Sequence, residues 1–228
     1  MNSLSYVITM DEPPICKKEI LRYTGEKNPS VDFLNILDEC LIEALPLLTY
    51  KVCYCETIFK ASHDVIDFGG FSVKSKDLAK NLQYGNKAII FASTIGTQID
   101  RLIYKYNRLS PSKALILQGI GAERVEALCD AFCHKISTTK NINLLPRFSP
   151  GYGDLSLNMQ KDIFNILDCS NKIGLTLNES LIMSPSKSVT AIMGITDKKV
   201  KNTDIKKCSN CNKIDCQFRS SIWILENF

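Results

Sequence analysis

The chain has 228 residues, of which 45% are hydrophobic and 23% are charged. A chain of this length and composition can bury a core without cross-links, which excludes disordered and fibrous proteins. Its longest apolar run, residues 88–92, is far shorter than the roughly 20 residues of a membrane-spanning helix. Residues 1–14 lack a basic segment ahead of an apolar run, so we expect no secretory signal and a cytoplasmic location.

Charge is distributed unevenly along the chain. The net charge is +4, and residues 197–228 alone carry seven basic and four acidic side chains. The remaining body is nearly neutral, without the clustered positive charge of nucleic-acid-binding proteins. We therefore expect one domain over residues 1–196, a basic cysteine-containing tail over residues 197–228, and no nucleic-acid partner.

Histidine and cysteine counts narrow the possible chemistry. Only His63 and His134 are present, which excludes a multi-histidine metal centre and leaves few bases for nucleophilic catalysis. Ten cysteines are too few for a disulfide scaffold, so we expect reduced thiols. The sequence contains no P-loop, and Gly119 and Gly121 lie inside a helical pattern where a dinucleotide-binding motif does not belong.

The N-terminal half predicts helices and strands in mixed order. A short helix over 15–24 ends at Gly25, and Ser30 caps a second helix over 31–48. The period then changes to about two over 49–59, as in a strand. Next we expect a short strand before the turn at Gly69 and Gly70, a helix from Ser75 to Leu82, and a buried strand over 87–93.

The C-terminal half predicts two helices after a turn at 94–97, the second running from Ser110 through Ile136. Beyond it we expect a loop over 146–154, a helix over 157–167, and strands around 181–183 and 189–195. Helices and strands follow each other in no regular alternation. We therefore predict an α+β fold with a mainly antiparallel, twisted sheet covered by helices.

The loop over 147–154, Arg-Phe-Ser-Pro-Gly-Tyr-Gly-Asp, is the most informative segment. Its two glycines let the backbone approach a ligand closely. Arg147 can pair with a carboxylate, and the ring of Tyr152 can lie against a cationic or heterocyclic group. An ordinary turn with a solvated arginine has the same composition, so the spacing alone leaves both interpretations open.

Several segments together resemble a known family. Residues 147–155 with Gln160 and Phe164, and the later stretch Met-Ser-Pro-Ser-Lys-Ser-Val-Thr-Ala-Ile-Met-Gly over 183–194, resemble the activation domain of cobalamin-dependent methionine synthase in its free-standing bacterial form. Residues 18–25, 92–100 and 121–126 look like family segments in the same order. The resemblance covers almost the whole chain, and it implies the α+β fold of that domain.

The resemblance implies a module that binds S-adenosylmethionine and offers its methyl group to a corrinoid whose cobalt has slipped to the inactive cob(II)alamin state. It implies two partners, a cobalamin-binding methionine synthase and an electron donor of the flavodoxin or ferredoxin type. Within such a methyltransferase system the chain acts only with its corrinoid-bearing partner. No side chain of its own has to serve as a catalytic acid or base.

The family's Arg-x-x-Pro-Gly-Tyr core falls within the loop, and it implies that Arg147 holds the methionine carboxylate and that Tyr152 contacts the ligand. After Tyr152 the chain continues with Gly-Asp-Leu, where the full-length enzymes have a proline-rich segment carrying a histidine. The residues implied to bind S-adenosylmethionine are Arg147, Ser149, Pro150, Gly151, Tyr152 and Glu123.

The tail contains a cluster of three cysteines, Cys208, Cys211 and Cys216. Three thiolates at this spacing can hold zinc or an iron–sulfur cluster, and a tail of reduced thiols is the alternative. Two other functions therefore stay open. One is a metal-binding or iron–sulfur redox or sensor protein, and the other is a reactivator of a different corrinoid methyltransferase.

Overall fold

A five-stranded antiparallel sheet is the centre of the computed structural model, which describes residues 4–197. In spatial order its strands are β1 (Tyr6–Thr9), β2 (Lys51–Ile58), β6 (Lys87–Thr94), β10 (Ser188–Thr196) and β7 (Asn143–Leu144). The register places Ile90 of β6 opposite both Cys55 of β2 and Ile192 of β10. The predicted α+β class with a mainly antiparallel sheet is confirmed.

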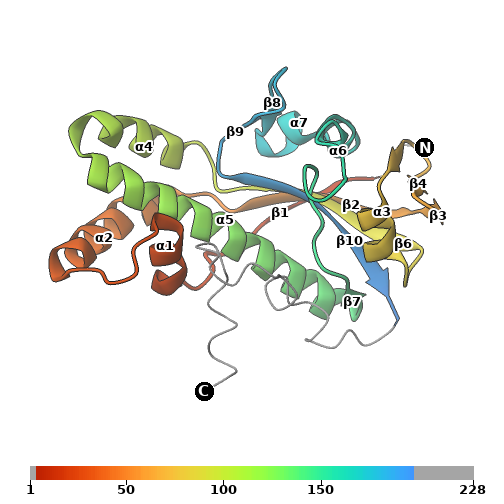
Figure 1. The fold of residues 1–228 in the computed structure, drawn as a ribbon, viewed down its shortest axis with the longest axis horizontal. Helices are drawn as coiled ribbons and strands as arrows, with labels where there is room; N and C mark the ends of the chain where they lie inside the picture. Colours follow the sequence, from red (N-terminus) through yellow and green to blue (C-terminus); the bar gives the residue numbers. More distant parts are fainter. Residues whose placement is uncertain (1–3, 198–228) are drawn as a thin grey trace.

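Four helices cover one face of this sheet. They are α1 (Lys17–Thr24), α2 (Val31–Ala44), α4 (Gln98–Leu109) and the long α5 (Pro111–Lys140), and a short 3-10 turn (Leu45–Leu47) follows α2. Figure 1 shows α1, α2 and α4 gathered around the first half of α5, whose second half continues towards β7. Gly119 permits the close approach of α1, because a Cβ there would lie 2.7 Å from the side chain of Thr24.

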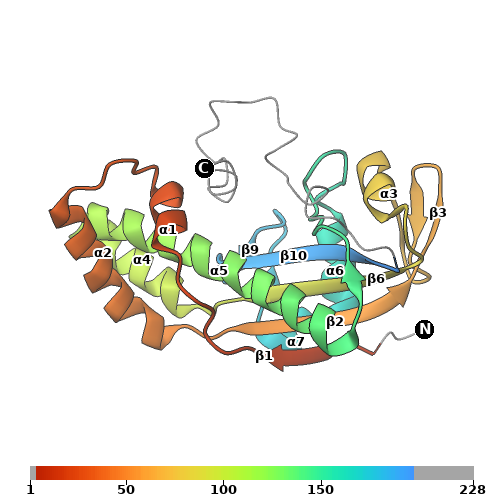
Figure 2. The ribbon, with the colours of Figure 1, turned by 90° about the horizontal axis from the view of Figure 1, so that it is seen from below.

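Smaller elements cover the opposite face. These are α3 (Lys76–Leu82), α6 (Met159–Leu167), α7 (Cys169–Ile173), a three-stranded sheet of β3 (Lys60–Ser62), β4 (Val65–Asp67) and β5 (Ser72–Lys74), and the pair β8 (Thr176–Leu177) and β9 (Met183–Ser184). In Figure 2, α5 crosses in front of the strands, and α6 and α7 lie behind them. The main sheet is therefore the middle layer.

Both faces of the sheet are buried, and each carries its own core. Val52 and Phe91 face α5 and pack with Phe132, whereas Cys53 and Ile90 face the layer of α6 and α7. The predicted period of two over 49–59 is confirmed. The two sets of alternating side chains nevertheless both lie inside the protein, because helices cover both faces.

Helix ends agree with the capping residues. Gly25 ends α1 with φ 77°, and the Oγ atoms of Ser30 and Ser75 accept the N–H groups of Phe33 and Leu78 at 3.2 and 3.0 Å. The long helix α5 runs four residues past its predicted end. The local sequence pattern does not predict β1, β7, β8 or α7, and it predicts one short strand where β3, β4 and β5 form a sheet.

Candidate functional site

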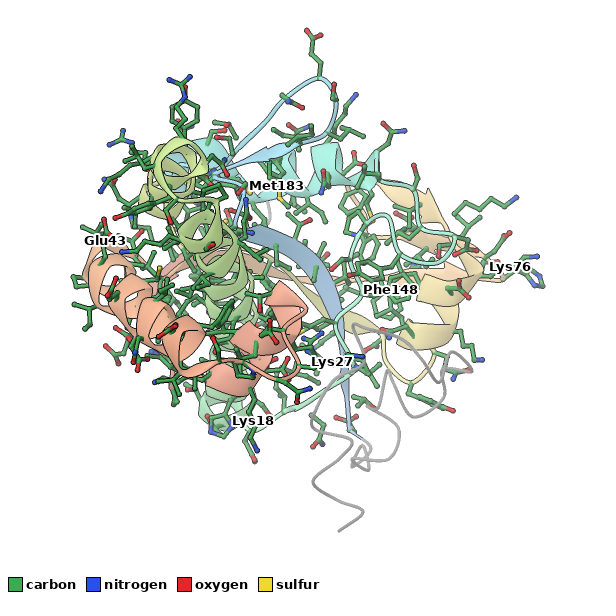
Figure 3. The ribbon with its side chains drawn as sticks, turned by 60° about the vertical axis from the view of Figure 1, so that its left-hand side comes forward. Lys18, Lys27, Glu43, Lys76, Phe148 and Met183 are labelled. Carbon is green, nitrogen blue, oxygen red and sulfur yellow. The ribbon has the colours of Figure 1, made fainter. Side chains whose placement is uncertain are left out.

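The loop after β7 lies along the outer edge of β10. Phe148 forms an antiparallel bridge with Ile192, in which each N–H donates to the other residue's carbonyl at 2.9 Å. Figure 3 shows Phe148 beside this strand. Because the pairing is antiparallel, the chain beyond Phe148 runs towards the beginning of β10. The loop is thereby held against the open edge of the sheet.

Two glycines shape the loop. Gly151 has φ +88° and Gly153 has φ +53°, backbone conformations that other residues rarely adopt. A Cβ on Gly153 would also lie 2.3 Å from a carboxylate oxygen of Asp77. The bend between them leaves Tyr152 66% exposed at the tip of the loop. The predicted close approach of backbone is therefore real, although the neighbour found at Gly153 is helix α3.

Asp154 ties the loop to the start of α3. Its carboxylate accepts hydrogen bonds from the hydroxyl of Ser75 and from the N–H groups of Lys76 and Asp77, the latter two at 2.8 and 3.2 Å. The hydrogen bond from Ser75, followed by the one from the Lys76 N–H, lowers the pKa of Asp154 below its ordinary value. The loop therefore has two anchors, β10 at Phe148 and α3 at Asp154.

Arg147 points back across α5. Its Nη2 lies 3.0 Å from Oε2 of Glu126 and 2.9 Å from Oδ1 of Asp130, which stand one turn apart on that helix. Burial disfavours the charged guanidinium, but the groups around it, Cys129 and Asp130 foremost, raise the pKa of Arg147 above its ordinary value. The arginine is charged, and two carboxylates hold it in place.

One guanidinium nitrogen of Arg147 is left without a hydrogen-bond partner in the described part of the chain. Nη1 is buried and has no hydrogen-bond partner among residues 4–197. A buried donor without a partner is costly, which makes this nitrogen the natural place for an acceptor from a ligand. Taken together, Arg147, Glu126 and Asp130 carry one surplus negative charge, so the cluster suits a ligand that brings a carboxylate and also a positive group.

The edge of β10 adds backbone groups to this surface. β7 covers the edge only at Ile195 and Thr196, and in the described part of the chain no strand pairs with the edge from Ser188 to Ala191. Peptide groups alternate in direction along a strand, so Thr190 presents its N–H and C=O outwards, as Ile192 does to Phe148. The candidate site is thus the surface that this edge, the loop and α5 form around Arg147.

Glu123 is engaged elsewhere. Its carboxylate pairs with Arg124 at 2.5 Å and accepts the N–H of Cys16 at 3.0 Å, and Arg124 in turn donates to the carbonyl groups of Pro13 and Pro14. This buried pair holds the segment before α1 against α5. The structure does not bring Glu123 to Arg147.

Glu126 and Asp130 are not among the predicted site residues, although their i,i+4 spacing marks one face of a helix. Two like charges at this spacing repel each other, which is itself a signal that a cation lies opposite. Which acidic residues face the loop depends on how α5 packs against it. Of the predicted binding residues, the structure groups Arg147, Ser149, Pro150, Gly151 and Tyr152 in one loop.

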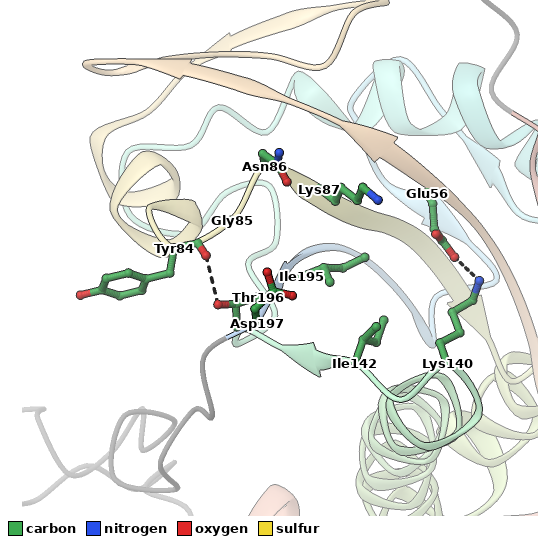
Figure 4. A pocket seen from close by; sticks show the side chains of 10 residues that line it. All are labelled: Glu56, Tyr84, Gly85, Asn86, Lys87, Lys140, Ile142, Ile195, Thr196 and Asp197. Carbon is green, nitrogen blue, oxygen red and sulfur yellow. Dashed lines mark hydrogen bonds and ion pairs between the residues drawn. The ribbon is translucent and has the colours of Figure 1, made fainter.

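A hollow lies at the far end of the sheet, away from the loop. It measures about 610 Å³, and an ion pair between Glu56 and Lys140 lines it (Figure 4). The carbonyl of Tyr84 accepts the hydroxyl of Thr196 at 3.0 Å on another side. Its charges are mixed and already paired in part, and none of the residues predicted to bind S-adenosylmethionine lines it.

No group of three or more potential metal ligands occurs between residues 4 and 197. The seven cysteines of that range are free thiols, and two of them, Cys53 and Cys169, are buried with their sulfurs 3.8 Å apart. The predicted metal ligands Cys208, Cys211 and Cys216 lie outside the described residues. In the part of the chain that the structure covers, no helix has the length and apolar character to cross a membrane.

Comparisons with known proteins point to one family. Residues 145–219 match the family model of the vitamin B12 dependent methionine synthase activation domain. Among solved structures, the MetH reactivation domain bound to AdoHcy is similar, with a TM-score of 0.63 and 12% identity over 88% of this chain and 81% of that chain. No curated protein matches. The chain thus has the fold of a methionine synthase reactivation domain, and its residues 145–219, which contain the loop from Arg147 to Asp154, are similar to the vitamin B12 dependent methionine synthase activation-domain family.

Proposed function

We propose that the chain binds S-adenosylmethionine at the site formed by the loop over 147–154, the edge of β10 and α5. In this proposal it presents the methyl group to the corrinoid of a methionine synthase partner. The observation that carries the proposal is the buried, unpartnered Nη1 of Arg147 within the segment that matches the family. The structural relative's bound AdoHcy is the demethylated form of the same ligand, and it supports the choice.

The charges of the site fit this ligand. S-adenosylmethionine carries a carboxylate, an ammonium and a sulfonium group, so its net charge is positive. Its carboxylate would accept from Nη1 of Arg147, while Glu126 and Asp130 attract the cationic part. Methyl transfer removes the sulfonium charge. The product therefore loses part of this attraction, which favours its release.

In the proposed reaction the chain binds S-adenosylmethionine and orients it. Arg147 and the open edge of β10 fix the amino-acid end of the ligand, and Tyr152 contacts the part that projects from the loop. The partner's corrinoid, reduced by one electron from a flavodoxin- or ferredoxin-type donor, supplies the nucleophile that takes the methyl group. Positioning alone can supply a large part of such a rate enhancement.

Calorimetric titration tests the proposal. We expect S-adenosylmethionine to bind and AdoHcy to bind more weakly, because AdoHcy lacks the sulfonium charge. Arg147→Ala should weaken binding about ten- to hundredfold, since a charge-assisted pair contributes about 1.5–3 kcal/mol. Arg147→Lys should fall between, because the charge stays and the forked geometry is lost.

Arg101→Ala is the matched control, because Arg101 is an exposed arginine on α4, which is not part of the proposed site. It should bind the ligand as the unchanged chain does. Melting curves show whether each variant is folded. If folded Arg147→Ala binds with unchanged affinity, Arg147 does not hold the carboxylate, and absence of binding to the unchanged chain would contradict the proposal itself.

A further inference from the structure

A second hollow lies between helix α3 and the hairpin of β3 and β4. It measures about 370 Å³, and none of its described lining residues belongs to the candidate site at Arg147. Two alanines, Ala61 on β3 and Ala79 on α3, leave the space between the two elements open. The remaining lining side chains are His63, Lys76, Lys80 and Gln83. All four can donate hydrogen bonds, and no carboxylate from residues 4–197 lines the hollow.

The two lysines stand on one face of α3. Lys76 and Lys80 are four residues apart, so both side chains lie on the side of the helix that faces the hairpin. His63 approaches from the other side, from a turn in which its φ is +53°. That backbone conformation is uncommon for a residue with a side chain. Cationic and donor groups from two different elements therefore converge on one space.

The acidic residues of this region are occupied elsewhere. Asp64 pairs with Lys74 at 3.5 Å, and Asp77 accepts the N–H of Asp154 at 3.3 Å on the loop side of α3. Asp154 binds the first N–H groups of the same helix. Within residues 4–197, Lys76 and Lys80 form no ion pair. The positive charge that faces the hollow is therefore not neutralised by an ion pair within the described part of the chain.

We propose that this hollow binds the phosphate group of a small phosphorylated molecule. A phosphate offers several acceptor oxygens and more than one negative charge, and lysine is a common partner for it. A carboxylate could engage fewer of the four donors. The volume corresponds to the lower end of small-molecule pockets, which suits a compact ligand.

The position of the hollow connects it to the loop. Figure 3 shows Lys76 at the periphery of the molecule, farther out than Phe148. The side chain of Lys76 lines the hollow, and its backbone N–H holds Asp154 at the end of the loop. The phosphate site does not depend on the proposed binding of S-adenosylmethionine, because Arg147 does not line the hollow.

The test titrates inorganic phosphate into the full chain by calorimetry, at constant ionic strength maintained with chloride. We expect saturable binding, and acetate should bind more weakly. Lys76→Gln with Lys80→Gln should weaken phosphate binding about tenfold, the loss of two charge-assisted contacts at an exposed site. Ala61→Glu should abolish binding, because Ala61 is exposed and its replacement places a carboxylate in the hollow.

Lys135→Gln with Lys161→Gln removes the same charge at two exposed positions on α5 and α6, so binding should be unchanged. Melting temperatures without phosphate show that each variant is folded. Equal weakening in both double variants would mean that phosphate responds only to net charge, and that would overturn the proposal. Non-saturable binding, or full binding by Ala61→Glu, would overturn it as well.

Discussion

Nη2 of Arg147 lies between two carboxylates, while Nη1 of the same guanidinium is buried without a partner among residues 4–197. The two nitrogens therefore have different roles. Glu126 and Asp130 fix the plane of the guanidinium before any ligand arrives. Fixing the donor in advance removes part of the ordering cost of binding, as expected for a site that must orient its ligand.

Tyr152 gives a test of how the ligand is held at the tip of the loop. Its side chain is 66% exposed, so substitution should leave the stability of the fold within about 0.5 kcal/mol. We expect Tyr152→Phe to weaken S-adenosylmethionine binding less than Tyr152→Ala, because the ring keeps its contact and only the hydroxyl is lost. Calorimetry of the two variants gives the order. Equal loss in both would mean that the hydroxyl, and not the ring, makes the essential contact.

Much of the loop could be predicted at the level of residues, and the partners of Arg147 could not. The glycines and the arginine stand next to each other in sequence, so their pattern is visible without a fold. The contact with Glu126 joins residues 21 positions apart, and it depends on which face of α5 meets the loop. Helical periodicity gives the face only when the start of the helix is fixed. The predicted start at Ser110 is one residue from the observed start at Pro111, but the pattern does not show which face of α5 the loop meets, and the nearby Glu123 falls on a buried face.

The loop over 147–154 and helix α3 form one structural unit. Gly153→Ala should lower stability for two reasons, the positive φ, which costs about 1 kcal/mol, and the displacement of Asp77. Gly174→Ala is the matched control, because Gly174 also has a positive φ, +69°, but no atom lies within 4 Å of its added Cβ. Denaturant unfolding of both variants measures the difference.

We expect Gly153→Ala to lose more stability than Gly174→Ala and also to bind S-adenosylmethionine more weakly, because Asp77 and the loop must move apart. The control should bind as the unchanged chain does. If the two variants lose equal stability and bind equally well, the contact between Gly153 and Asp77 does not position the loop.

The hydrogen bonds of Asp154 to the start of α3 predict that the stability of the fold depends on pH. The pKa of Asp154 is lowered in the folded chain, chiefly by the hydroxyl of Ser75. Its stabilising effect is therefore present above the ordinary pKa of an aspartate, about 3.9, and is lost as the pH falls through the lower folded value. Asp154→Asn should melt below the unchanged chain at pH 7, and the difference should shrink below about pH 4.

Glu179→Gln serves as the control for Asp154→Asn, because Glu179 is an exposed carboxylate with no hydrogen bond or ion pair within residues 4–197. Its melting curve should follow that of the unchanged chain at each pH. A constant difference between Asp154→Asn and the unchanged chain from pH 7 to pH 3 would show that the charge of Asp154 does not hold the start of α3.

Elements with strong local signals were predicted well. Ser30, Ser75 and Gly25 mark helix ends through their own hydrogen bonds or backbone preference, so they act without help from distant residues. The strand β1 has only four residues and exists because it pairs with β2, some 45 positions later. The bridge between Phe148 and Ile192 is likewise long-range. Such pairings are set by the assembled sheet and leave little trace in the local pattern.

At the scale of the whole molecule, two cores lie on opposite faces of one sheet. The face towards α5 carries aromatic side chains such as Tyr54 and Phe91, and the other face carries small ones such as Cys53 and Ala92. The sheet therefore packs against a separate core on each face, and the candidate site at Arg147 lies at its edge, where Phe148 pairs with Ile192.

The tail cysteines give the prediction that involves the chain as a whole. Cys208, Cys211 and Cys216 can supply three thiolates, and we predict that protein purified anaerobically contains about one zinc ion or one iron–sulfur cluster per chain. Cys211→Ser should abolish this content, because a hydroxyl is a poor substitute for a thiolate. Elemental analysis and absorption spectra measure it.

Cys16→Ser is the control, because Cys16 is an exposed thiol outside the tail. It should retain the metal. Metal loss should leave the melting transition of the domain in place, since the buried side chains described for the two cores lie before position 197. Metal-free protein with all three tail thiols open to alkylation would contradict the metal site. Loss of the melting transition in Cys211→Ser would instead show that the tail is needed to hold the two-sided sheet together.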